Sequence, residues 1–111
     1  MSEGGVIHVS IGMWDGHIIS IECKGHAGYA ESGKDLVCAG VSSILFGALN
    51  ALDEMEKEYV RLRVTNSKIS IRVLQDNEHI QLLLKMILIQ LETVRESYQE
   101  YIEIKKLEVQ P

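Results

Sequence analysis

The chain has 111 residues, of which 46% are hydrophobic, so we expect one domain over residues 1–111 with a modest core. Its 11 Lys and Arg against 16 Asp and Glu give a net charge of −5, which argues against direct binding of nucleic acid. No secretory leader or bilayer-long apolar run is recognisable, so we expect a cytoplasmic protein without a membrane partner. Two cysteines and four scattered histidines, without CxxC or HExxH spacing, predict free thiols, no metal and no cofactor.

Residues 6–24 alternate between apolar and polar side chains on either side of Asp15-Gly16. Alternation is typical of half-buried strands, and Asp-Gly suits a type I′ turn, which needs positive φ at both central residues. The pattern predicts a hairpin whose second strand places Ile19, Ile21 and Cys23 on one face. We therefore interpret Cys23 as a core residue.

A glycine-rich stretch, GHAGYAESGKDLVCAG at residues 25–40, follows this hairpin. Apolar residues then recur at helical spacing, and we expect a helix from about Leu36 to about Lys57 with Asp35 as its N-cap. Such a start makes Cys38 the third helical residue. Its sulfur would then lie at the positive end of the helix dipole, which favours a thiolate.

Residues 60–73 alternate again and predict a second hairpin. Arg61, Arg63 and Arg72 point outward in this pattern. They form either an ordinary solvated face or a binding patch, and we favour the solvated face because the arginines alternate with core residues.

The remainder of the chain predicts a helix that is capped by Asp76 or Asn77 and runs to Tyr98, followed by a closing strand at residues 101–109. The order ββαββαβ indicates an α+β fold with both helices on one face of a mostly antiparallel sheet. The second helix carries additional apolar residues on a neighbouring face, so either this helix is deeply buried or it packs against another subunit, and in so small a domain we favour a homodimer. These residues are Leu82, Met86 and Ile89.

The glycine-rich stretch has two interpretations from its residues alone. Cys38 is either a nucleophile with His26 as its imidazole, or a packed core residue, because free cysteine is among the most buried residue types. Gly25, Gly28 and Gly33 permit a tight loop that a substrate backbone can approach. Nearness in sequence does not establish pairing in space, so spacing leaves both interpretations open.

The runs GHAGYA and GKDLVCAGVS, with the order of elements over essentially the whole chain, resemble the ribosomal-processing cysteine protease family Prp. The resemblance implies that His26 and Cys38 are the catalytic pair, and Asp35 and Ser42 match further motif positions. It also implies a dimer that removes the N-terminal extension of ribosomal large-subunit protein twenty-seven. Gly40 stands where the family more often has alanine, a change that weakens the helix slightly.

We expect the Cys38 thiolate to attack the scissile carbonyl, and His26 to maintain the thiolate and protonate the leaving amine. Backbone N–H groups at the helix start would stabilise the oxyanion. Asp35 is either the helix cap, which we favour, or the group that orients His26. Ser42 either supports the thiol or bonds a carbonyl of its own helix. A noncatalytic ribosome-assembly module and a thiol hydrolase acting on another substrate remain as alternative functions.

Overall fold

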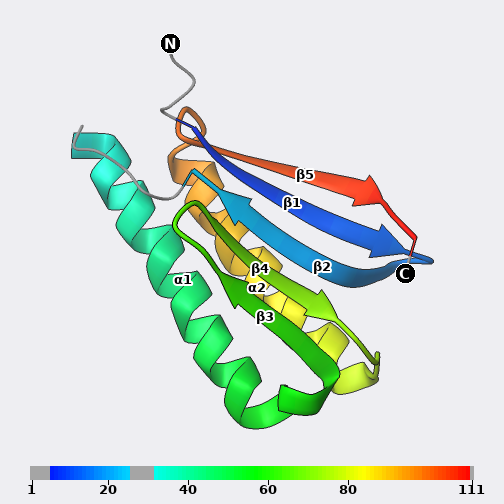
Figure 1. Cartoon of the computed structure of the whole chain (residues 1–111). Helices are drawn as coiled ribbons and strands as arrows, with labels where there is room; N and C mark the ends of the chain where they lie inside the picture. Colours follow the sequence, from blue (N-terminus) through cyan, green and yellow to red (C-terminus); the bar gives the residue numbers. More distant parts are fainter. Residues whose placement is uncertain (1–5, 26–31, 111) are drawn as a thin grey trace.

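A computed structural model describes residues 6–25 and 32–110, with only the backbone for residues 32–35 (Figure 1). The observed order of elements confirms the predicted ββαββαβ pattern, with one short 3-10 helix added after the first α-helix. In chain order the elements are β1 (Ile7–Trp14), β2 (His17–Lys24), α1 (Ser32–Glu56), η2 (Lys57–Tyr59), β3 (Val60–Val64), β4 (Lys68–Val73), α2 (Glu78–Ser97) and β5 (Ile102–Glu108).

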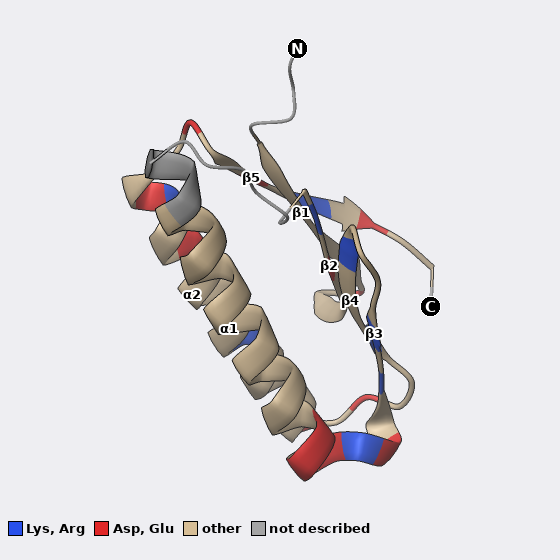
Figure 2. Cartoon of the chain, turned by 60° about the vertical axis from the view of Figure 1, so that its left-hand side comes forward, with Lys and Arg blue, Asp and Glu red and all other residues tan. Residues whose placement is uncertain are grey.

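The strands form one sheet in the order β3-β4-β2-β1-β5. All neighbouring strands are antiparallel except β1 and β5, which run parallel. Both helices lie on the same face of the sheet, as the edge-on view shows (Figure 2). The predicted α+β architecture, with two helices on one face of a mostly antiparallel sheet, is therefore confirmed.

The β1–β2 hairpin turns through Asp15 and Gly16, whose φ angles of 52° and 79° confirm the predicted type of turn. A β-bulge interrupts the ladder, because Gly12 pairs with Ser20 while Met13 pairs with Ile18. The bulge brings Ile18 into the core beneath the helices, whereas Ile19 is buried outside that core cluster. The prediction that Ile19 shares a face with Ile21 is therefore wrong.

The second helix begins as predicted. Asn77 is its N-cap, and the Asn77 side chain accepts a hydrogen bond of 2.9 Å from the backbone N–H of Ile80. Five apolar residues of α2 are buried between this helix and the sheet. They are Ile80, Leu84, Ile87, Leu88 and Leu91.

One helical segment, Leu36–Tyr59, is long and apolar enough to cross a bilayer by length and composition. The prediction that the chain has no such run is therefore wrong. A core helix meets the same criterion, and Val37, Val41, Leu45 and Leu52 of α1 are buried in the core of this domain.

Candidate active site

Cys38 lies in the second turn of α1, since this helix starts at Ser32 rather than at Leu36. The prediction that Asp35 is the N-cap is therefore wrong. Aspartate is favourable in the first helical turn as well as at the cap, because both positions meet the positive end of the dipole, so its presence does not locate the helix start.

The earlier start of α1 changes the expected electrostatics around Cys38. The backbone N–H groups without an intrahelical partner all precede Leu36, and the influence of the dipole falls off within the first turn. The expectation that Cys38 lies at the helix terminus beside an oxyanion hole of free N–H groups is therefore wrong.

The two cysteines are free and occupy the same buried core cluster. Cys23 of β2 has no exposed surface, which confirms it as a core residue, whereas Cys38 of α1 is 9% exposed. Burial raises the pKa of the Cys23 thiol to about 12, and the neighbouring charge of Cys38 contributes in the same direction. Cys23 at the end of β2 and Cys38 in the second turn of α1 therefore belong to one buried cluster.

Gly25 follows β2 and adopts a φ of +83°, a left-handed conformation that favours glycine. A Cβ atom at this position would lie 2.8 Å from the carbonyl oxygen of Val6. The chain leaving β2 therefore passes so close to the start of β1 that a larger residue does not fit. This confirms the prediction that Gly25 is needed for a tight backbone conformation.

The other predicted site residues fall in three groups. His26 and Gly28 lie outside the described residues. Gly33 belongs to the first turn of α1, so its assignment to a loop is wrong, because the helix starts before it. Ser42 is half-buried one helical turn after Cys38, in the predicted position.

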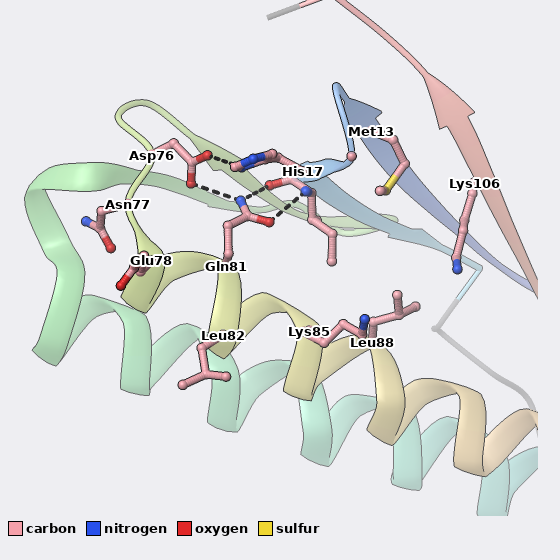
Figure 3. A pocket seen from close by; sticks show the side chains of 12 residues that line it. Met13, His17, Asp76, Asn77, Glu78, Gln81, Leu82, Lys85, Leu88 and Lys106 are labelled. Atoms are coloured by element: carbon pink, nitrogen blue, oxygen red, sulfur yellow. Dashed lines mark hydrogen bonds and ion pairs between the residues drawn. The ribbon is translucent and has the colours of Figure 1, made fainter.

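A second polar cluster lies at the opposite end of β2, where His17, Asp76 and Gln81 line a cavity of about 670 Å³ (Figure 3). The imidazole Nδ1 of His17 is 2.7 Å from Asp76 Oδ2, and Gln81 Nε2 donates to Asp76 Oδ1 at 2.9 Å. Sequence reasoning missed this cluster because it joins residues far apart in the chain. No local spacing could have indicated it.

Gln81 gives this cluster a structural role. Its side chain accepts from the backbone N–H of Ile18 at 2.9 Å and donates to the carbonyl oxygen of Ile18 at 2.8 Å. Ile18 lies beyond the last described β2–β4 pair, Ser20 with Arg72, so the amide of Gln81 takes the place of a neighbouring strand. No serine, threonine or cysteine is among the residues that line the cavity, so it offers no hydroxyl or thiol nucleophile of the kind that covalent peptide cleavage uses. Among the described residues, no group of three or more His, Cys, Asp or Glu is placed to hold a metal ion.

The family model of cysteine protease Prp matches residues 6–103, which include Cys38, both helices, the first four strands and the start of β5. The chain belongs to the cysteine protease Prp family. It is therefore a cysteine protease.

Curated relatives of this Prp chain carry the name ribosomal processing cysteine protease Prp. The Staphylococcus aureus relative is 33% identical over 93 residues, which cover 81% of this chain and 88% of the relative. The Bacillus subtilis relative is 58% identical over 38 residues, 34% of each chain. A Mycoplasma genitalium relative is 31% identical over 83 residues, 75% of this chain and 83% of its own.

Solved structures of Prp proteins share the fold. The crystal structure of Prp from S. aureus in complex with a substrate peptide has a TM-score of 0.84 and 32% identity, covering 92% of this chain and 100% of that one. The S. aureus Prp with a covalently linked product peptide has a TM-score of 0.81 and 33% identity, with the same coverage. A Streptococcus mutans protein has a TM-score of 0.84 and 28% identity, covering 98% and 100%.

Proposed function

We propose that this Prp-family protease removes the N-terminal extension of ribosomal large-subunit protein twenty-seven during ribosome maturation. The observation that carries the proposal is the likeness to the S. aureus Prp, which is named as ribosomal processing and was crystallised with a substrate peptide. The covalently linked product peptide of the second S. aureus structure supports covalent catalysis for this chain as well. A ribosomal substrate and free thiols both suit the cytoplasm, which we propose as the compartment.

Of the two thiols, Cys38 is the one suited to be the nucleophile. The thiolate is the reactive form of cysteine. Burial raises the pKa of the Cys23 thiol to about 12, so this thiol stays protonated at physiological pH. Cys23 has no exposed surface that a peptide can reach, whereas Cys38 keeps 9% of its surface exposed. In the proposed mechanism the Cys38 thiolate attacks the scissile carbonyl, forms an acyl-enzyme and releases the C-terminal product, and water then hydrolyses the thioester.

His26 is the proposed partner of Cys38. It follows Gly25 directly, and Gly25 lies two residues after Cys23, whose thiol is affected by the charge of Cys38. The proposal rests on the match of GHAGYA to the motif of the family. His26 would maintain the Cys38 thiolate and then protonate the leaving amine.

Asp35 is the proposed group that orients His26. The start of α1 at Ser32 removes the cap role, and orientation of the imidazole is the other role predicted for this residue. Asp35→Asn should lower kcat for peptide cleavage while leaving the free energy of unfolding nearly unchanged. A fall in the free energy of unfolding that accompanies the fall in kcat would assign Asp35 to helix stability instead.

A homodimer is proposed from the outer surface of the two helices. Leu82 is 72% exposed, and Met86 and Ile89 are about half exposed on the same helix. Beside them α1 and α2 form an apolar groove of about 390 Å³. Its lining includes Ile44, Ala48, Ala51, Leu83, Met86 and Ile87. An apolar patch of this kind on a small domain is typical of an interaction surface, and a second copy offers a matching patch.

Mass spectrometry of the extended ribosomal precursor, incubated with the purified chain, tests the proposed function. The wild type should trim the extension at one bond, and Cys38→Ala should not. Cys23→Ala is the matched control, since it removes the other thiol and should keep the cleavage. Binding of the precursor without cleavage by the wild type would indicate a noncatalytic assembly module. Cleavage of small esters but not of the precursor would indicate a different thiol hydrolase.

A further inference from the structure

The sheet face opposite the helices concentrates the positive charge of an otherwise acidic chain. The cross-strand pairs place basic side chains side by side along this outer face, and Figure 2 shows basic residues recurring on the strands. Six lysines and arginines share the face with two glutamates. They are Lys24, Arg61, Arg63, Lys68, Arg72 and Lys105, with Glu22 and Glu103.

Three arginines on this face form no ion pair with the residues that the structure describes, although Glu22 lines the same depression as they do. Arg61 and Arg72 are directly opposite each other in the β3–β4 ladder, an arrangement of like charges that destabilises a sheet. Within the described part of the chain, the ion pair on these strands joins Lys68 to Glu22 at 3.9 Å, and none involves the three arginines. The sheet therefore tolerates repulsion that an anionic ligand would relieve.

The basic face is hollowed rather than flat. A shallow depression of about 170 Å³ is lined by all three arginines. An adjoining depression of about 350 Å³ includes Trp14, Ile19 and Arg72 in its lining, together with the carboxylates of Asp15 and Asp76, so Arg72 joins the two depressions. Trp14 is the single tryptophan of the chain and is 44% exposed. The bulge that buries Ile19 on this face supplies the apolar floor beside the indole.

We propose that this outer face binds a single-stranded RNA segment. The planar guanidinium groups of Arg61, Arg63 and Arg72 suit phosphate oxygens, and the exposed ring of Trp14 suits stacking of a base at one end. Proteins that bind single-stranded nucleic acid without sequence preference combine these two features, a basic groove for the backbone and an aromatic side chain on which a base stacks. Both described α-helices lie on the other face of the sheet, as Figure 2 shows, so neither of them can enter a duplex groove from this face, and a single strand fits better than a duplex.

The net charge of −5 led to the expectation that nucleic acid is not a direct partner, but that value averages over the whole surface. The counterion-release argument applies to the local face that meets the phosphates. The choice of RNA over DNA rests on the proposed function, because a ribosomal precursor is met beside ribosomal RNA. Cys38 lies on the helix-bearing side, so the proposed RNA face is separate from the proposed catalytic site.

Fluorescence anisotropy with an unstructured, labelled RNA of about 12 nucleotides tests the proposal, with salt varied between about 50 and 200 mM. The wild type should bind, and the tryptophan emission of Trp14 should be quenched at the same RNA concentrations. Replacing all three arginines by glutamine should weaken binding at least about tenfold and reduce the slope of log K against log salt by about 2. Trp14→Ala should weaken binding several-fold, whereas Trp14→Phe should retain it.

The matched control replaces Lys57, Lys85 and Lys106 by glutamine, which removes the same charge from exposed positions away from the outer face. This control should bind RNA as the wild type does. An equal loss in the control, or no binding by the wild type at about 50 mM salt, would overturn the proposal. Equal binding of the same sequence as DNA, or displacement of the RNA by polyglutamate, would also contradict it. Cleavage of a short precursor peptide should be unchanged in the arginine variant. The RNA-binding proposal can therefore be overturned without overturning the proposed protease function, and the reverse also holds.

Discussion

Cys23 and Cys38 share one buried cluster, and burial together with the charge of Cys38 raises the pKa of the Cys23 thiol to about 12. The Cys23 thiol is therefore neutral at physiological pH, whereas Cys38 keeps 9% of its surface exposed. Iodoacetamide at about pH 8 should alkylate Cys38 and leave Cys23 unmodified in the folded protein, because the thiolate is the reactive species. Peptide mass mapping measures this directly. Modification of both cysteines at equal rates under native conditions would contradict the assignment.

The raised pKa of Cys23 predicts a loss of stability in alkali. Below pH 9 the thiol is protonated in both states, so it contributes no pH dependence. Between pH 9.0 and about 12 the unfolded thiol releases its proton while the folded one retains it, which favours the unfolded state. The free energy of unfolding should fall with a slope approaching about 1.4 kcal/mol per pH unit from this group. Denaturant titrations of wild type and Cys23→Ala should differ by that slope, and parallel curves would refute the prediction.

Gly25 should be sensitive to the smallest substitution. Gly25→Ala combines a positive φ with a contact of 2.8 Å between the new Cβ atom and the Val6 carbonyl oxygen. The strain of the left-handed conformation alone costs about 1–2 kcal/mol, and the contact adds to it. Gly16→Ala is the matched control, because Gly16 has a φ of +79° but nothing within 4 Å of the added Cβ atom. Chemical denaturation should show a larger loss for Gly25→Ala than for Gly16→Ala, and equal losses would count against the close approach to β1.

The amide of Gln81 should contribute to stability without contributing to cleavage. Gln81→Ala removes the partner of both backbone groups of Ile18 and should lower the free energy of unfolding by about 1–3 kcal/mol. Glu96→Ala, at an exposed position of the same helix, should change it by no more than about 0.5 kcal/mol. Under conditions where both variants are folded, kcat/KM for the precursor should match the wild type. A selective fall in kcat for Gln81→Ala would place this cluster in the chemistry after all.

The proposed dimer should depend on the outer surface of α2. Leu82→Glu introduces a charge into the exposed apolar patch of α2 and should give a species of 12.5 kDa in size-exclusion chromatography with light scattering. Leu107→Glu is the control, since Leu107 is an exposed leucine on the edge strand β5. It should leave the wild-type mass of two chains unchanged. A wild type that elutes as a single chain at micromolar concentration would exclude the dimer.

The features that the sequence predicted correctly depend on local chemistry. Asp15-Gly16 specifies its turn through the φ angles that two adjacent residues adopt, and Asn77 caps α2 through a side chain three residues from its donor. The alternation of apolar residues is equally local, and it yielded both hairpins and the α+β class. The GHAGYA and GKDLVCAGVS runs pointed to the family that the comparisons confirm.

The features that the sequence did not predict depend on contacts between distant segments. The start of α1 was placed four residues late, since Asp35 is favourable both at a cap and in the first turn. The bulge at Ile19 depends on how β2 pairs with β1. The cluster of His17, Asp76 and Gln81 joins the start of β2 to the start of α2, which are far apart in the sequence. The alternation predicted that Arg61, Arg63 and Arg72 point outward, but it did not predict that Arg61 lies directly opposite Arg72, which depends on the register between β3 and β4.

The parallel pairing of β5 with β1 has a consequence for synthesis of the chain. β1 is the earliest strand to leave the ribosome and β5 is the last, so β1 keeps one unpaired edge until residues 102–108 have been translated. An exposed edge strand is a site for pairing with other chains. During translation the nascent domain therefore presents a temporary docking edge for chaperones or for aggregation, and the final strand closes it.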